Sequence, residues 1–230
     1  MCKGGCFDLK IPERALLPLR LVCLVLAFVV IGVAIDVSIK ANLGVGAWTV
    51  FHLGIAGHVG LTQGQVSQIV GLAIIAVSYF LGIKPAIGTV LNMLLIGWFF
   101  DASVALRLIP PANSAPLGLL YLLASTLLMG FGGAMYMSAG LGAGPRDSLM
   151  LALIRRTAWP VRSIRTGMEI TVLVLGWLMG GPVGFGTLVL SVGLGPAVEI
   201  FFEFFRLLTA RSELAGTVMS VPVPKVRAPL

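Results

Sequence analysis

The side chains of this protein that could do chemistry are ionisable groups placed inside or beside apolar segments. Arg146 and Asp147 are adjacent, and Glu169 follows Arg165 by four residues, which puts both on one face of a helix. A charge at bilayer depth costs about 2.5–3.5 kcal/mol on insertion scales, so each one indicates a role. Arg146 could face an anionic ligand or lipid phosphate, and Asp147 could cap a helix N-terminus. Glu169 could serve a binding site or, with Arg165, only close a helix end.

Two further polar groups could contribute to a site. Asn92 lies one turn beyond Gly88 and could bond a substrate or a neighbouring helix. His52 could titrate near neutral pH and take part in proton coupling. No third ligand accompanies His52 and His58, so the sequence predicts no metal site. Because no Ser-His-Asp order or Cys-His pairing stands out, we expect neither enzymatic activity nor a cofactor.

The segments that must position these groups repeat at an offset of 98 residues. Leu43-Gly44-Val45-Gly46 returns as Leu141-Gly142-Ala143-Gly144, and the acid Asp101 is matched by Glu199. A membrane chain with two such halves is the usual build of a secondary transporter.

Each glycine motif precedes a segment too short to cross a bilayer, 47–62 in the first half and 145–160 in the second. Apolar residues recur at helical spacing in the first of these, so a short re-entrant or interfacial helix is expected. Non-helical backbone at membrane depth is tolerated only when it is buried or lines a wet cavity. We call the motifs at 43–46 and 141–144 the glycine corners. They are therefore a natural ligand site, although glycines in membrane helices also serve packing and turns.

The composition indicates an integral membrane protein, with 58% hydrophobic residues, 11% charged residues and a mean hydropathy of +1.03. Most of the six apolar segments approach the ~20 residues that a span requires. They are 16–39, 66–83, 87–106, 117–137, 170–179 with its flanks, and 183–205. Three spans in each half would make the second half enter from the opposite side. We therefore expect an all-α membrane protein of about six transmembrane helices, built as a 3+3 inverted-topology repeat with two short re-entrant or interfacial helices.

The net charge of +7 is distributed as a topology signal, because the basic residues flank the apolar segments. This distribution argues against nucleic-acid binding. With a cytoplasmic N-terminus, every Lys and Arg except Lys40 and Arg107 falls on the cytoplasmic side. A multi-pass protein of the inner membrane with both termini in the cytoplasm is expected. The first apolar segment should be retained, because its repeat partner lies within the chain. Asp36 and Lys40, one turn apart, are expected to pair at the outer end of that segment.

The expected division of the chain follows from the spans. It consists of a cytoplasmic segment at 1–15, a first repeat at 16–107, a linker at 108–116, a second repeat at 117–206 and a disordered cytoplasmic tail at 207–230.

The motifs also resemble a family of bacterial integral membrane proteins, the YczE/YyaS/YitT group. The resemblance rests on 43–48 with His52, on 82–92 and on 142–147, and it covers roughly 19–205. It implies a multi-span bacterial inner-membrane protein without a settled activity. The family pattern often carries Pro-Trp-Asp where this chain has Ala47-Trp48-Thr49. The second copy keeps Pro145 and Asp147, so the two corners need not be equivalent.

Two functions remain open from the sequence. The first is a transporter or exporter of an unidentified small molecule by alternating access. The second is a non-transporting scaffold or regulatory partner of a biosynthetic complex. The lipid bilayer is the one partner that the sequence requires, and a homo-oligomer stays open. The residues predicted to contact substrate are Gly44, Gly46, Asn92, Gly142, Gly144, Arg146, Asp147 and Glu169.

Overall fold

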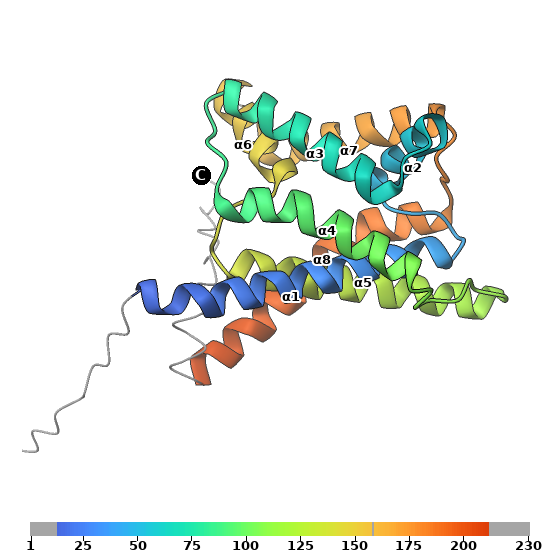
Figure 1. The fold of residues 1–230 in the computed structure, drawn as a ribbon, viewed down its shortest axis with the longest axis horizontal. Coiled ribbons are helices and arrows are strands. Elements are labelled where there is room, and N and C mark those ends of the chain that lie inside the picture. Colours follow the sequence, from blue (N-terminus) through green and yellow to red (C-terminus); the bar gives the residue numbers. More distant parts are fainter. Residues whose placement is uncertain (1–12, 158, 212–230) are drawn as a thin grey trace, which may run out of the picture.

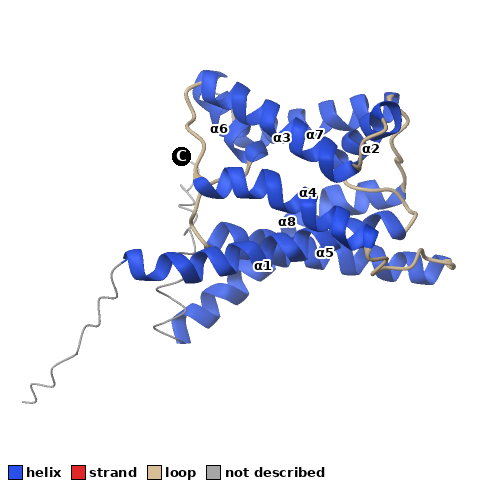
Figure 2. Cartoon of the chain, in the orientation of Figure 1, coloured by secondary structure: helices blue, strands red, loops and turns tan. Residues whose placement is uncertain are grey.

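The computed structural model describes residues 13–157 and 159–211, and all regular structure in these ranges is helical (Figure 2). The all-α prediction is confirmed for this part of the chain. The expected N-terminal segment and C-terminal tail lie mostly outside it, although the last helix continues to Arg211. The helices are α1 (Glu13–Lys40), α2 (Ala47–Val59), α3 (Gln63–Phe80), α4 (Ile87–Ala105), α5 (Ala115–Ser138), α6 (Pro145–Thr157), α7 (Val161–Leu178) and α8 (Phe185–Arg211).

Five of these helices, α1, α3, α4, α5 and α8, are long and apolar enough to cross a membrane. The sequence predicted six, and the missing one is the segment 170–179 with its flanks, which falls on α7. This helix has 18 residues, a length of about 27 Å, but it carries Arg162, Arg165 and Glu169. The charges, and not the length, separate α7 from the other five.

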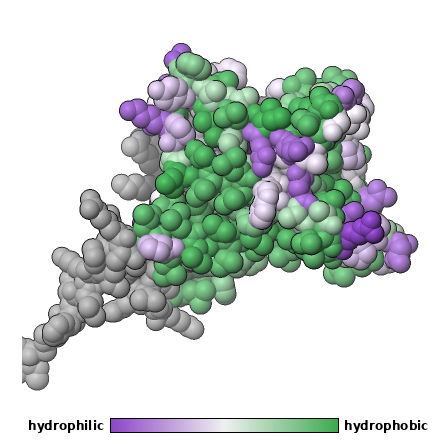
Figure 3. All heavy atoms as spheres, viewed as in Figure 1, coloured by the Kyte–Doolittle hydropathy of each residue, from purple (hydrophilic) through white to green (hydrophobic). Residues whose placement is uncertain are grey.

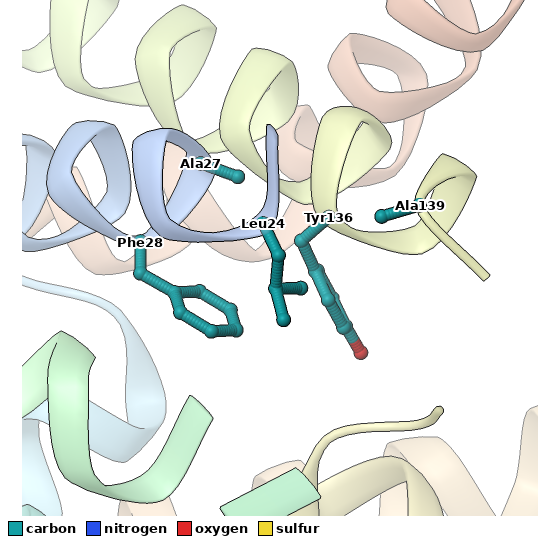
Figure 4. Packing of buried hydrophobic residues seen from close by; sticks show 5 residues of the cluster. All are labelled: Leu24, Ala27, Phe28, Tyr136 and Ala139. Carbon is teal, nitrogen blue, oxygen red and sulfur yellow. The ribbon is translucent and has the colours of Figure 1, made fainter. Parts of the chain in front are cut away.

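The helices lie in two main groups with α4 between them (Figure 1). α1 packs along α5 and α4, and α5 packs along α8, while α2 contacts α7 and α3 contacts α6. Where α1 meets α5, the buried core consists of Leu24, Ala27, Phe28, Tyr136 and Ala139 (Figure 4). Gly132 allows the close approach, because a Cβ there would meet the Ala27 carbonyl and the Ile31 side chain. Small residues at helix contacts are typical of membrane proteins.

The outer surface is apolar. Side chains such as Leu72, Leu120, Leu188 and Val192 are each at least 59% exposed. Figure 3 shows one face covered mostly by hydrophobic residues, with hydrophilic ones toward the two ends and in a small group beside α3 and α4. So much exposed apolar surface is expected of a protein whose solvent is lipid.

The helix bounds recur along the chain. α2 and α6 begin and end 98 residues apart, as do α3 and α7, while α4 and α8 begin at that offset. Left-handed turn residues recur with them, at Asn42 and Gly140 and again at Gly82 and Gly180.

The short helices α2 and α6 point toward opposite ends of the molecule (Figure 1). Trp48, at the start of α2, lines a pocket with Gly167 and Met168 from the middle of α7. Gly54, two turns later, packs on Gly176 near the end of α7. α2 therefore starts at the middle of the molecule and runs outward. α2 and α6 have only 13 residues each, which is shorter than the ~20 residues that a span requires.

Asp36 does not form the expected pair with Lys40. Its carboxylate is 1% exposed and accepts a hydrogen bond of 2.6 Å from Ser103 Oγ of α4. The expectation was wrong because position 36 faces the helix α4, which offers a hydroxyl donor, and not the membrane surface.

Candidate functional site

The two glycine corners are fixed by matching backbone contacts. The Gly88 N–H, at the start of α4, donates to the Leu141 carbonyl at 3.0 Å. The Gly186 N–H, at the start of α8, donates to the Leu43 carbonyl at 2.6 Å. The two donors, Gly88 and Gly186, are 98 residues apart, and so are the two acceptors, Leu43 and Leu141. The corner at Leu141 is thus tied to the start of α4, and the corner at Leu43 to the start of α8.

Gly44 and Gly142 serve these corners through backbone geometry. Their φ angles are +100° and +123°, a region that favours glycine. A Cβ on Gly44 would also meet the backbone of Gly184, and one on Gly142 would meet Ala86. The turn-and-packing alternative therefore explains both residues without a ligand.

The N-termini of α2 and α6 meet at the centre of the molecule. The guanidinium carbon of Arg146, the second residue of α6, lies 4.4 Å from the ring centroid of Trp48, the second residue of α2. This is a cation–π contact. Because the two helices leave in opposite directions, the positive ends of their dipoles face one point. We call the space around Arg146 and Trp48 the half-helix junction.

The start of α6 is already neutralised. The Gly144 N–H donates to Tyr136 Oη at 2.9 Å, and the Tyr136 hydroxyl donates to Asp147 Oδ2 at 2.7 Å. Tyr136 is only 7% exposed, and its hydroxyl points away from α1 and α5 (Figure 4). A Cβ on Gly144 would lie 3.5 Å from Asn92 Nδ2, which brings that amide to the same place. Asp147 lies in the first turn of α6, where a negative charge is stabilising.

The start of α2 has no such compensation. Its N-cap is Gly46, which provides no side-chain hydrogen bond, and its first turn holds no acid. No described group accepts a hydrogen bond from the N–H of Ala47, Trp48 or Thr49. A Cβ on Gly46 would meet nothing within 4 Å. The first turn of α2 therefore offers free donors beside open space.

His52 lies one turn beyond Trp48 on the same side of α2. Its ring is 3% exposed, touches the rings of Trp48 and Phe51, and makes no hydrogen bond within the described part of the chain. Burial, and after it the positive charge of Arg146, lower the pKa of His52 to about 3. The imidazole is therefore neutral near pH 7, in contrast to the titration that the sequence suggested. Residues 13–157 and 159–211 hold no group of three His, Cys, Asp or Glu that could bind a metal.

A pocket of about 440 Å³ lies beside the junction, between α7 and α8. Glu169 lines it and also pairs with Arg165, with 3.6 Å between Oε1 and Nε. The predicted i, i+4 pair thus forms, although both side chains stay partly exposed. The other polar lining residues are Thr166 of α7 and Thr187 and Ser191 of α8, and Ala47 brings in the start of α2.

Four of the eight predicted substrate residues, Asn92, Gly144, Arg146 and Asp147, come together at the junction. Glu169 lines the neighbouring pocket, and Gly46, the N-cap of α2, lies beside open space. Gly44 and Gly142 lie in the corners.

The prediction left out Trp48 and Tyr136, which contact Arg146 and Asp147. A signal for Trp48 was present, because it stands 98 residues before Arg146. Tyr136 carries a hydroxyl in an otherwise apolar segment, and such a group usually finds a partner.

Three curated proteins illustrate the similarity of this chain to known sequences. It is 44% identical over 174 residues to an uncharacterized membrane protein of Bacillus subtilis, YczE, an alignment that covers 75% of this chain and 78% of that protein. It is 31% identical over 185 residues to an uncharacterized protein of Haemophilus influenzae, covering 80% and 84%. It is 24% identical over 176 residues to YyaS of Bacillus subtilis, covering 74% and 85%. These matches confirm the resemblance seen in the motifs. The model of a family of unknown function, DUF6198, matches residues 18–203. No solved structure matches the chain.

Proposed function

The chain belongs to the DUF6198 family, whose function is unknown, and from its geometry we propose that it is a transporter of a small molecule that works by alternating access. Its five candidate spans make it a polytopic membrane protein, and its relative YczE is named a membrane protein. The observation that carries the proposal is a difference between two otherwise matching halves: α3 is packed on α4, whereas α7 and α8 are parted.

The matching of the halves supports an inverted repeat. Helix bounds, positive φ angles and the bonds at the glycine corners all recur at the offset of 98. The described start of α1 and the end of α8 lie at the same end of the molecule (Figure 1). An even number of crossings is needed for that, so α7 would cross as well, with Arg162 and Arg165 in its first turns and Glu169 lining the pocket. The positive-inside pattern of the sequence supports a cytoplasmic location for this end.

In the first half, α3 and α4 are closed against each other. Asp101 of α4 accepts a hydrogen bond of 2.5 Å from Thr62 Oγ1 and one of 3.1 Å from the Gly64 N–H. A Cβ on Gly97 would meet the Gly64 carbonyl, so the two backbones touch. Further along, the side chain of Met93 packs on Gly71.

In the second half, the equivalent helices α7 and α8 barely approach each other. Gly195, the counterpart of Gly97, would have nothing within 4 Å of an added Cβ. The counterparts of Gly71 and Met93 are Glu169 and Ser191, which both line the pocket. Large and small side chains have changed places between the two helices, so α7 could close on α8 with Glu169 against Ser191. Such a movement would eliminate the pocket between α7 and α8.

Two gates flanking one central site, one closed and one open, are what alternating access requires. The open α7–α8 gate would face the cytoplasm in this state. A scaffold, the second candidate, has no need for α7 to move, and no described feature favours it specifically.

A pair of disulfide cross-links tests the proposal. The first pair, Thr62→Cys with Asp101→Cys, joins side chains that already touch, so it should form almost completely. The second pair, Pro160→Cys with Glu199→Cys, stands 98 residues later across the open gate. If the α7–α8 gate closes whenever the α3–α4 gate opens, the second pair should also form in membranes under mild oxidation. Its rate should fall at least tenfold when the first pair is already closed in the same protein.

The matched control combines Thr62→Cys with Glu199→Cys, which belong to different halves and should not cross-link. Free thiols are counted by a maleimide mass shift in a background in which Cys2, Cys6 and Cys23 are serine. A second pair that stays reduced at all oxidation times would contradict alternating access and favour the scaffold.

A further inference from the structure

The half-helix junction has a positive character, because the guanidinium of Arg146 meets the uncapped first turn of α2 there. Asp147 is oriented to the Tyr136 hydroxyl, and Glu169 to Arg165. Within the described residues Arg146 makes neither an ion pair nor a hydrogen bond: its guanidinium contacts the face of Trp48, and Asp147 and Glu169 attract it without pairing with it. Although it stands at the centre of the protein, part of its side chain is exposed. A guanidinium in that position is available to a ligand.

The start of α2 points at the same space. Its first three N–H groups are free, and no acid offsets the dipole. His52 adds a second and independent indication, because its polar ring is 97% buried beside Trp48 without a hydrogen-bond partner among the described residues. A buried polar group without a partner costs free energy unless something completes it.

We propose that the half-helix junction binds an anionic group, a carboxylate or a phosphate, of the small water-soluble molecule that the protein transports. Arg146 and the free N–H groups of Ala47 and Trp48 are the donors, and neutral His52 can supply a further one. A cation is disfavoured because Arg146 already occupies the face of Trp48. This inference rests on the proposed function only for the statement that the bound molecule is transported.

The arrangement also explains the difference between the two corners. Position 49 in the first half is Thr and position 147 in the second is Asp, so only α6 carries its own counter-charge. If α2 also carried an acid in its first turn, the two acids would offset the positive charge at the junction, and it would attract no anion. If α6 lacked Asp147, the positive charge of Arg146 and the positive ends of both helix dipoles would meet without any counter-charge.

The test measures thermal unfolding of the purified full-length protein in a non-ionic detergent. Acetate and inorganic phosphate are compared with tetramethylammonium chloride, all at equal ionic strength set with sodium chloride. We expect one of the anions, at tens of millimolar, to raise the unfolding temperature by roughly 5 °C, while tetramethylammonium has no effect. Arg146→Gln should abolish the shift, and Arg146→Lys should retain part of it. Arg156→Gln, on the same helix but at its far end, should leave the shift intact.

Three results would overturn the inference: no response to either anion, a response to tetramethylammonium alone, or an anion response unchanged by Arg146→Gln. If Arg146→Gln fails to fold, the comparison between ions in the unmodified protein decides. A shift produced by phosphatidylglycerol in mixed micelles but by neither free anion would assign the site to lipid and contradict a water-soluble ligand. If an anion binds but the pair Pro160→Cys with Glu199→Cys never cross-links, the transport proposal is refuted and the anion site is retained.

Discussion

Gly44→Ala is expected to destabilise the protein strongly, whereas Gly46→Ala, two residues later in the same motif, is expected to be tolerated. Gly44 has a φ of +100°, and a Cβ there would meet the backbone of Gly184 and the hydroxyl of Thr187. Backbone strain and overpacking of this kind cost about 1–3 kcal/mol each. The unfolding temperature in detergent should therefore fall by roughly 5–10 °C.

Gly46 provides the matched control. Its φ is −61°, which alanine adopts readily, and an added Cβ would meet nothing within 4 Å. Its unfolding temperature should stay within about 2 °C of that of the unmodified protein. Equal losses at both positions would mean that the corner does not have the geometry described, and that the motif as a whole is needed for folding.

Asp101→Ala is expected to open the α3–α4 gate. The carboxylate accepts hydrogen bonds from Thr62 and from the Gly64 N–H, and hydrogen bonds to charged groups contribute about 1.5–3 kcal/mol. Because these groups are partly exposed, solvent reduces the loss, and a shift of about tenfold toward the open gate is expected. The measurement is the labelling rate of Ser67→Cys, which lies at this contact, with a water-soluble maleimide.

Glu199→Ala is the control for this experiment. Glu199 is the counterpart of Asp101 on α8, is exposed and has no partner within the described part of the chain. Its removal should not raise the labelling rate of Ser67→Cys. Labelling that is the same in all three proteins would show that Asp101 does not hold the gate closed.

The sequence predicted the helical class, the positions of the apolar helices and the two short helices to within a few residues. It could do so because each depends on local signals, namely apolar runs, glycine punctuation and length. The start of α6 was also recognisable, since Asp147 is an acid in a first turn after a glycine corner.

The remaining features depend on which helices meet, and a single sequence does not encode that directly. Asp36 looked like a partner of Lys40 along one helix, but α4 brings Ser103 to it. His52 looked titratable until packing removed it from water. The parting of α7 and α8 was also unforeseen, because these helices begin 98 residues after α3 and α4, which pack on each other.

The most direct test of the account is the topology of the last residues of α2 and α6. Val59 and Thr157 stand 98 residues apart, end the two short helices and are exposed. Each is replaced by cysteine in the background without Cys2, Cys6 and Cys23, and intact cells are treated with an impermeant maleimide. We predict labelling of Val59→Cys in intact cells, and of Thr157→Cys only after permeabilisation. Labelling of both from the same side would contradict the opposed half-helices, and with them the junction and the two gates.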